Sequence, residues 1–257
     1  MAVTLGEEER ARYARQIILR EIGGGGQRRL KQATAVVIGA GGIGSPVIAY
    51  LAGAGIGRLV VIDDDVVDRS NLQRQILFGT ADIDAPKAAQ AAAAVARHNP
   101  HVSVAPITAR ITADNAADLI AGAAVVVDGC DNFATRLAVA DAALRQRIPL
   151  VSAAVGQFEG QLAVYRGWEA DKPCYRCLVG DAPDRDEATC AEQGVLGPVT
   201  GILGSMAALE AIRAVAPFGE DPAGRLILLD LLDLRFRNIR VPKDPACPAC
   251  SKGDMVS

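Results

Sequence analysis

Four of the six cysteines stand in two C-x-x-C pairs, a spacing that suits a bound metal ion. The pairs are Cys174 with Cys177 and Cys247 with Cys250. Without a secretion signal, such pairs favour metal binding over disulfide bonds. Four thiolates close a tetrahedral zinc site and leave no position for water, so we expect a structural zinc that ties the C-terminal region to the middle of the chain. A redox-active C-x-x-C pair is the alternative.

A glycine-rich turn offers a second kind of chemistry, the binding of phosphates. G-A-G-G-I-G fits the G-x-G-x-x-G pattern with Gly39, Gly41 and Gly44, after a β-branched apolar run. Glycines let the backbone approach phosphates, and the N-terminus of a following helix attracts their charge. Asp63 ends the next predicted strand, where a ribose-binding carboxylate belongs. The turn predicts a nucleotide site but does not distinguish NAD from ATP.

Four polar residues from separate segments favour ATP. Asn71 and Arg74 lie in S-N-L-Q-R-Q, Lys87 opens a predicted helix, and Asp131 follows a predicted strand. A triphosphate that loses pyrophosphate needs cations at the leaving group and a carboxylate for magnesium, whereas a dinucleotide needs little beyond backbone amides. Arg74 and Lys87 can supply the cations, and Asp131 the carboxylate. Taken singly, these three also have ordinary interpretations as a surface arginine, a solvated lysine and a helix N-cap.

These residues must be positioned by strands and helices that alternate along the chain. Apolar runs predict strands at 34–39, 58–63, 102–107, 123–128 and 149–154. Helical patterns lie between them, at 44–54, 85–97, 114–121 and 132–146. This alternation predicts an α/β fold with a Rossmann-like, doubly wound and mostly parallel sheet. The polar residues follow strands whose carboxyl ends share one edge of the sheet, where ligands bind in this architecture.

Both ends of the chain depart from this alternation. Residues 7–22 predict an amphipathic helix, the run Gly23 to Gly26 breaks it, and a short helix follows at 27–32. After Gly156 the pattern changes to predicted antiparallel strands at 160–166 and within 225–240, with a helix at 201–216 between them. We therefore expect an antiparallel C-terminal extension of the sheet.

Composition excludes several classes of partner. The 257 residues carry a formal net charge of -3, and only 4% are aromatic. Nucleic-acid binding needs clustered Lys and Arg and stacking rings, so it is not expected. The first ten residues lack the apolar stretch of a signal peptide, and the most apolar long segment, 195–216, contains Pro198, Glu210 and Arg213. We expect a cytoplasmic protein without a membrane or nucleic-acid partner.

Several motifs in order resemble the ThiF/MoeB/HesA family, bacterial relatives of ubiquitin-activating enzymes. They are R-Y-A-R-Q, the glycine turn, S-N-L-Q-R-Q, I-D-A-P-K, D-G-C-D-N, C-Y-R-C and the closing C-P-A-C, which span about 8–250. The resemblance implies an ATP-dependent adenylyltransferase that converts the C-terminal glycine carboxylate of a ubiquitin-like sulfur-carrier protein into an acyl-AMP. It also implies one domain over 1–257, with a nucleotide-binding part at about 33–155, a carrier-binding and zinc part at about 156–250, and a tail at 251–257.

The resemblance also implies roles for individual residues. The implied nucleotide contacts are Gly42 at the phosphates, Asp63 at the ribose, and Asn71, Arg74 and Lys87 around the triphosphate, with Asp131 on magnesium. Arg15 is implied to reach the nucleotide from the other subunit of a homodimer, like an arginine finger in trans. Cys190 matches a cysteine that some relatives link to the carrier or its sulfur and that others do without.

The carrier and the pathway are less sharply specified. The carrier must present an extended tail, ending Gly-Gly by the family pattern, and Val155 to Gly160 is its expected neighbourhood. Because the sequence ends soon after Cys250, we expect a separate sulfur donor. D-D-D at 63–65 and Q-I-L-F at 75–78 resemble the thiamine branch, whereas F-E-G-Q at 158–161 resembles the molybdopterin branch.

Two other functions remain open at this stage. An NAD-dependent dehydrogenase explains the glycine turn and Asp63, but it leaves Arg74, Lys87 and Asp131 without a shared role. A non-catalytic, zinc-stapled binder of a ubiquitin-like partner explains the cysteines, but it does not need the phosphate-facing residues.

Overall fold

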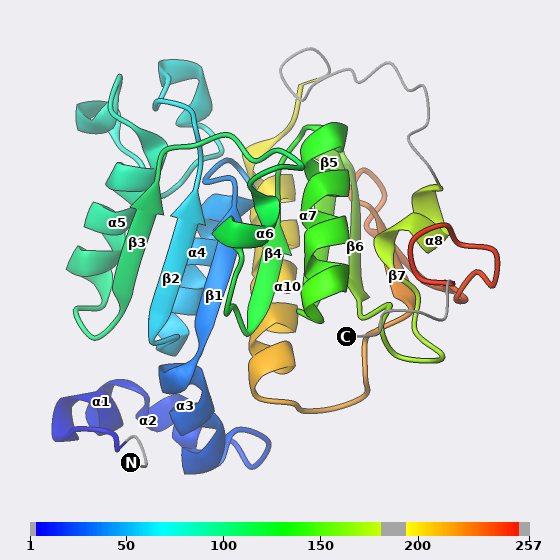
Figure 1. The fold of residues 1–257 in the computed structure, drawn as a ribbon. Coiled ribbons are helices and arrows are strands. Elements are labelled where there is room, and N and C mark those ends of the chain that lie inside the picture. The colour runs from blue at the N-terminus through cyan, green and yellow to red at the C-terminus, as the bar shows by residue number, and fades with distance from the viewer. Residues whose placement is uncertain (1–3, 181–193, 252–257) are drawn as a thin grey trace.

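The computed structural model describes residues 4–180 and 194–251, and within them the chain builds an eight-stranded sheet (Figure 1). The strand order is β3-β2-β1-β4-β5-β6-β7-β8. The strands are β1 (Thr34–Ile38), β2 (Arg58–Ile62), β3 (Ser103–Ile107), β4 (Val125–Asp128), β5 (Leu150–Gly156), β6 (Glu159–Tyr165), β7 (Arg225–Asp230) and β8 (Arg235–Arg240). Strands β1 to β5 pair in parallel, and β6, β7 and β8 add antiparallel. The predicted mostly parallel sheet with an antiparallel extension is confirmed.

Helices cover both faces of the parallel part (Figure 1). One face carries α4 (Gly44–Ala54), α5 (Lys87–His98) and α10 (Gly197–Val215), and the other carries α6 (Ala116–Leu119) and α7 (Phe133–Gln146). Successive strand residues point to opposite faces of the sheet. Val37 therefore packs in the core under α4, α5 and α10, whereas Val36 and Ile38 pack in the core under α6 and α7. Both faces of the sheet are therefore buried, as the continuous apolar runs predicted.

The predicted helix 201–216 begins earlier than expected, because α10 starts at Gly197 with Pro198 in its first turn. By length and composition alone, α10 could cross a membrane, and it is the one helix in the described ranges of which this is true. It packs against α4 and strands β4, β5 and β6, as core helices of soluble proteins do. Its apolar character is therefore weak evidence for a membrane span.

The N-terminal region differs from the prediction. The expected helix 7–22 is two short helices, α1 (Glu7–Arg12) and α2 (Ala14–Ile17), because the chain bends where the buried Tyr13 hydroxyl accepts a hydrogen bond of 2.8 Å from Asn99 Nδ2. The glycine run does not end a helix but begins one, since α3 spans Gly23–Gln32 and Gly23 turns the chain with a φ of +58°. These helices lie beyond the amino ends of the parallel strands (Figure 1).

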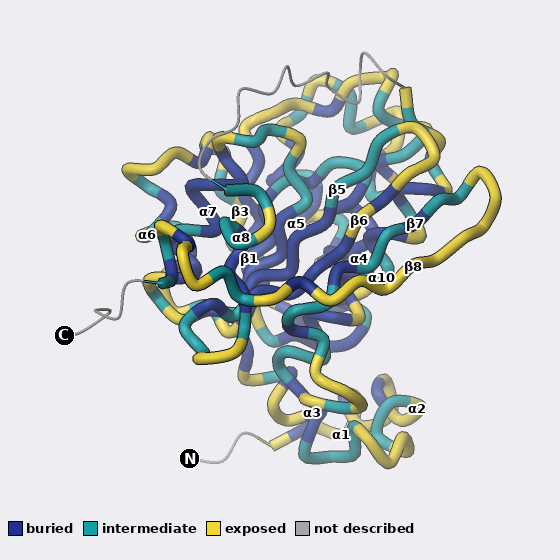
Figure 2. Tube along the Cα trace, turned by 90° about the vertical axis from the view of Figure 1, so that its right-hand side faces the viewer, coloured by how far each residue is buried: buried dark blue, intermediate teal, exposed yellow. Residues whose placement is uncertain are grey.

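The last strand forms an exposed edge of the sheet. Every residue of β8 is exposed, and Figure 2 shows it as a continuous yellow run beside β7. Phe236 and Ile239 of this strand and Leu232 and Leu234 of the preceding turn are among the large apolar side chains open to solvent. Contiguous exposed apolar side chains of this kind mark interaction surfaces.

Candidate active site

A cavity of about 380 Å³ opens at the carboxyl edge of the parallel strands. It lies between the loops that follow β1, β2, β3 and β4, with the start of α10 on one side. Of the nine residues expected at the nucleotide or its magnesium, all but Gly44 line it: Gly39, Gly41, Gly42, Asp63, Asn71, Arg74, Lys87 and Asp131. The structure thus brings together side chains from four separate segments of the chain.

The glycine turn joins β1 to α4 with no room for side chains at its end. Gly44 begins α4, and a Cβ there would lie 1.8 Å from the carbonyl oxygen of Gly39. Gly42 faces Thr200 of α10, whose Cγ2 would be 3.0 Å from a Cβ at position 42. Gly41 has more space, since the nearest atom to its added Cβ is Gln75 Nε2 at 3.9 Å. The backbone is therefore open to a phosphate-sized group at Gly41 and closed behind it.

Asp63 is held by the backbone around it. Its Oδ2 accepts a hydrogen bond of 2.6 Å from the N–H of Ala40, and its Oδ1 accepts one of 2.9 Å from the N–H of Asp65. Burial raises the pKa of the Asp63 carboxyl, and the two N–H donors partly offset this effect. A carboxylate oxygen has two lone pairs, so each oxygen can still accept a second hydrogen bond from a ligand hydroxyl.

Two cations enter the cavity from different segments. The interpretation of Lys87 as a solvated helix-start residue is wrong, because the side chain is buried and its Nζ lies 2.8 Å from Asp65 Oδ2. Arg74 is half-buried and donates from Nη1 to the carbonyl of Ser70 at 3.2 Å. The short helix η1 (Arg69–Asn71), capped by Asp68, brings this arginine and Asn71 to the cavity.

Asp131 presents an exposed carboxylate to the same cavity. The interpretation of Asp131 as the helix N-cap is wrong, because Asn132 caps α7 by accepting a 2.9 Å hydrogen bond from the N–H of Thr135. The Asp131 side chain is thereby left for other partners. An exposed carboxylate facing two cations and a glycine turn suits a hard divalent cation that bridges to phosphate.

Two cavity residues were missed in the sequence. Gln75 is buried, and its Oε1 has no hydrogen-bond partner among the described residues. It directly follows Arg74 in S-N-L-Q-R-Q, where no spacing distinguished it. Arg136 is also buried and lines the cavity from α7. A charged residue on the buried face of an alanine-rich helix was the signal that could have revealed it.

The predicted residue Arg15 does not line the cavity of its own chain. Arg15 is exposed on α2, which lies at the opposite end of the sheet from the carboxyl ends of the strands (Figure 1). It cannot reach the cavity of its own chain. Cys190 lies outside the described residues. Cys130 lines the cavity, but burial raises the pKa of its thiol well above the ordinary value, which disfavours the nucleophilic thiolate.

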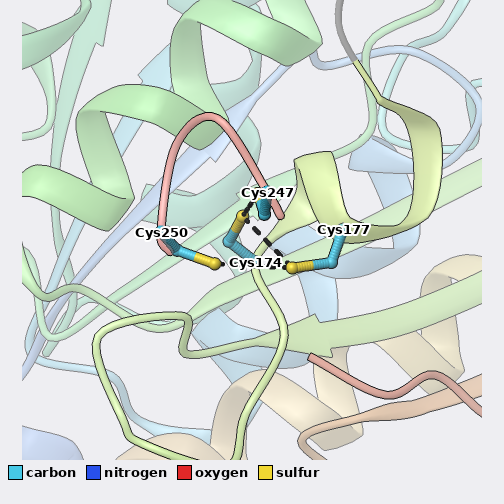
Figure 3. Close-up of side chains that lie close together, drawn as sticks. All are labelled: Cys174, Cys177, Cys247 and Cys250. Atoms are coloured by element: carbon cyan, nitrogen blue, oxygen red, sulfur yellow. Dashed lines mark hydrogen bonds between the residues drawn. The ribbon is translucent and has the colours of Figure 1, made fainter. Parts of the chain in front are cut away.

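The four paired cysteines converge at one point, as Figure 3 shows. Sulfur–sulfur distances are 3.8 Å for Cys174 and Cys177, 3.5 Å for Cys174 and Cys247, and 3.4 Å for Cys177 and Cys250. A tetrahedral zinc with bonds of about 2.3 Å spaces its sulfurs roughly 3.8 Å apart. The cluster therefore has the donor set and spacing of a closed zinc site, next to α8 (Tyr175–Val179).

A groove of about 770 Å³ runs across the antiparallel part of the sheet. It is lined by the β5–β6 hairpin, by β7 and β8, and by the turn between these two strands; Phe158, Leu232 and Arg237 are among the lining residues. Val155 lines both this groove and the cavity. An extended chain lying in the groove could therefore pass its end over Val155 and into the cavity.

The chain is similar to several known proteins. It is 44% identical to the SAMP-activating enzyme E1 of Haloferax volcanii over 258 residues, covering 100% of this chain and 94% of that one. It is 39% identical to the molybdopterin-synthase adenylyltransferase of Salmonella typhimurium, covering 96% and 99%. It is 43% identical to the sulfur carrier protein adenylyltransferase of Thermus thermophilus, covering 95% and 92%.

Comparisons of fold and of family models agree with these similarities. Among solved structures, E. coli MccB with MccA-N7isoASN superposes with a TM-score of 0.82 at 22% identity, covering 94% of this chain and 74% of that chain, which shows a shared fold. The family model described as "ThiF family" matches residues 13–249. By this match and by the full-length similarities, the chain belongs to the ThiF family.

Proposed function

We propose that the protein is an ATP-dependent adenylyltransferase that activates the C-terminal carboxylate of a ubiquitin-like sulfur-carrier protein. The observation that carries the proposal is the convergence of Arg74, Lys87 and Asp131 on one cavity beside the glycine turn. An NAD-dependent dehydrogenase would leave these three without a common task. The names of the relatives at 39–44% identity, which include adenylyltransferases and an activating enzyme, support the same activity.

The proposed reaction needs positioning and charge neutralisation rather than a protein nucleophile. The carrier carboxylate attacks the α-phosphorus of ATP, an acyl–phosphate bond forms, and the bond to the β-phosphate oxygen breaks to release pyrophosphate. Lys87 and Arg74 neutralise the charge that develops on the leaving group, and backbone N–H groups near Gly41 hold the phosphates. Asp131 would hold magnesium, which supplies Lewis-acid neutralisation of phosphate oxygens when bound. Asp63 accepts from the ribose hydroxyls.

The groove is proposed as the path of the carrier tail. Gly156 and Gly160 lie at the β5–β6 hairpin, and Val155 stands where the groove meets the cavity. A narrow, extended tail such as Gly-Gly suits this passage, because glycines let two backbones approach closely. The exposed apolar residues around β8 would contact the folded part of the carrier. This division agrees with a nucleotide-binding part at about 33–155 and a carrier-binding and zinc part at about 156–250.

A homodimer is proposed because the family resemblance gives Arg15 a role at the nucleotide that this residue cannot take within its own chain. Arg15 is exposed on α2 and lies away from its own cavity, so it can serve only the cavity of a second copy. The exposed apolar side chains Ile18 and Leu19 lie just after α2 and would be covered in such a dimer. The proposal includes a structural zinc on the four cysteines and a cytoplasmic location.

The test of the function is mass spectrometry of candidate carriers after incubation with the protein, ATP and magnesium. An AMP adduct on the C-terminus of one carrier is expected, and the carrier that reacts identifies the pathway. ATP–pyrophosphate exchange that depends on the same carrier provides a second measurement. A thermal shift with NAD but not with ATP and magnesium would favour the dehydrogenase, and ATP binding without any exchange would favour a non-catalytic binder.

A further inference from the structure

Arg136 is a buried charge that bridges two elements of the site. Its side chain comes from α7, it is 8% exposed, and it lines the cavity. Nη2 donates to the carbonyl of Cys130 and, at 2.9 Å, to the carbonyl of Ala153. Nη1 donates to Ser152 Oγ at 3.4 Å and to Asp128 Oδ2 at 3.5 Å. Burying a guanidinium is costly unless hydrogen bonds and an opposite charge compensate for the lost hydration.

The guanidinium stands where two paired strands separate. Strand β4 ends at Asp128, which pairs with Ser152, whereas β5 continues to Gly156. Beyond Ser152 the β4 side of β5 faces the loop that follows β4, and the carbonyl of Ala153 takes its hydrogen bond from Arg136. The planar fork of the arginine serves four acceptors at once, because Nη2 donates to both carbonyls while Nη1 donates to Ser152 and Asp128; one lysine ammonium has only three N–H donors.

Both sides of this gap carry residues of the proposed reaction. On one side Asp131 lies between Cys130, whose carbonyl Arg136 holds, and Asn132, which caps α7. The N–H of Cys130 also donates to Asp128 Oδ1 at 3.1 Å. On the other side Val155 continues the strand that Arg136 contacts at Ala153, and it lines the cavity and the groove. One side chain therefore holds the backbone next to Asp131 and the strand that leads to Val155.

We propose that Arg136 is a positioning residue that fixes Asp131 relative to the Val155 side of the tail path. It does so through the carbonyls of Cys130 and Ala153, without itself contacting the reacting atoms. This inference rests on the proposed function. A misplacement of about 1 Å between reacting groups costs on the order of a hundredfold in rate, so the spacing matters for catalysis.

The experiment compares Arg136→Lys and Arg136→Met with the wild type in two measurements. The first is the magnesium concentration at the midpoint of the thermal shift produced by ATP, which requires no carrier. The second is the KM for carrier in ATP–pyrophosphate exchange. Both quantities are expected to rise on the order of tenfold in Arg136→Lys, which keeps the charge and loses the fork.

The matched control is Arg176→Lys. Arg176 makes a two-point ion pair with Asp141, at 2.8 Å and 2.8 Å, that ties α8 to α7 away from the cavity. This control is expected to lower the melting temperature without moving the magnesium midpoint or the carrier KM. If Arg136→Lys behaves in the same way as Arg176→Lys, Arg136 is only structural and the proposal is wrong.

A further variant covers the case in which the Arg136 variants do not fold. Ser152→Ala removes one of the acceptors of Arg136 and only one hydroxyl group. It is expected to raise both quantities by a smaller factor, and no change in either would overturn the proposal. Failure of the proposed function can be told apart from failure of this inference. If the wild type adenylates no carrier, the proposed function fails, but the magnesium midpoint can still be measured and still tests the link between Arg136 and Asp131.

Discussion

Lys87 and Asp65 form an ion pair with one buried and one exposed partner. Nζ of Lys87 lies 2.8 Å from Asp65 Oδ2, and the side chains are 6% and 70% exposed. A second contact joins their backbones, since the N–H of Lys87 donates to the carbonyl of Asp65 at 2.9 Å. The ammonium is thus held inside the cavity by a carboxylate that water can also solvate. An incoming phosphate can replace Asp65 as the partner of Lys87 at little cost.

This arrangement predicts that Lys87→Met lowers catalysis and leaves the stability of the fold nearly unchanged. Loss of the ammonium should lower the rate of carrier-dependent pyrophosphate exchange by about a hundredfold or more, because a leaving-group cation is lost. Stability should change little, since methionine fills the space and Asp65 remains solvated. Lys172→Met, which removes a lysine paired with Asp221 outside the cavity, is the control. Near-normal exchange in Lys87→Met would remove this residue from the mechanism.

Replacing the buried Gln75 should lower the affinity for ATP without lowering the stability of the fold. Its buried Oε1 has no partner in the described part of the chain, and such an atom costs about 1–3 kcal/mol. Gln75→Met keeps the shape and removes the unsatisfied acceptor, so the free energy of unfolding should stay level or rise. ATP affinity should fall, as measured by titration calorimetry. Unchanged affinity would mean that Gln75 only fills space beside Gly41.

The cysteine cluster predicts a metal-dependent stability. Chelation or Cys177→Ala should release one zinc per chain and destabilise the fold by about 3 kcal/mol or more, a fall in melting temperature of roughly 10 °C. Metal analysis by mass spectrometry and calorimetric melting measure the two effects. Cys190→Ala serves as the control, and it should retain zinc and adenylation. A metal-free wild-type protein of equal stability would contradict the zinc site.

Glu9 predicts a pH dependence at the N-terminal helices. Burial alone would raise the pKa of its carboxyl, but hydrogen bonds from Lys31 Nζ at 2.5 Å and the N–H of Gly6 at 2.8 Å, with the charge of Lys31, lower it below the ordinary value of 4.5. A lowered carboxyl pKa stabilises the folded state above 4.5, and the gain is lost as pH falls through the folded value.

Glu9→Gln should therefore destabilise α1 at neutral pH and lose its effect in acid. Hydrogen exchange of the α1 amides as a function of pH measures this difference. Glu7→Gln, at an exposed position on the same helix, is the control and should show a smaller effect. A Glu9→Gln effect that stays constant from neutral pH to below 4.5 would show that packing, rather than charge, is responsible.

The strand and motif patterns predicted the cavity well because its residues follow strands that are neighbours in the sheet. Once β1, β2 and β4 are parallel neighbours, their carboxyl ends must bring Gly41, Asp63 and Asp131 to one edge. The same reasoning could not find Arg136, whose role depends on where β4 stops while β5 continues. The relative ends of the two strands depend on how β4 and β5 are aligned in the sheet, and this alignment cannot be read from the sequence.

The N-terminal region was predicted least well because tertiary contacts override local preference there. The glycine run Gly23 to Gly26 lowers helix propensity, yet it forms the first turn of α3, where Gly26 is buried and lies close to Ala216 after α10. Likewise, the bend at Tyr13 depends on its contact with Asn99, which lies far away in sequence. Neither contact produces a periodic pattern in the sequence from which it could be predicted.

The position of Arg15 leads to a test by complementation between two inactive variants. If Arg15 acts in trans, Arg15→Ala and Lys87→Ala should each abolish exchange when alone. After random mixing, about half of the dimers are mixed, and one of the two sites in each has both residues intact, so activity should return to about a quarter of the wild-type value. If Arg15 acted within its own chain, every site in the mixed dimer would lack one residue. A mixture as inactive as its parents, with subunit exchange verified by native mass spectrometry, would therefore exclude the trans arrangement.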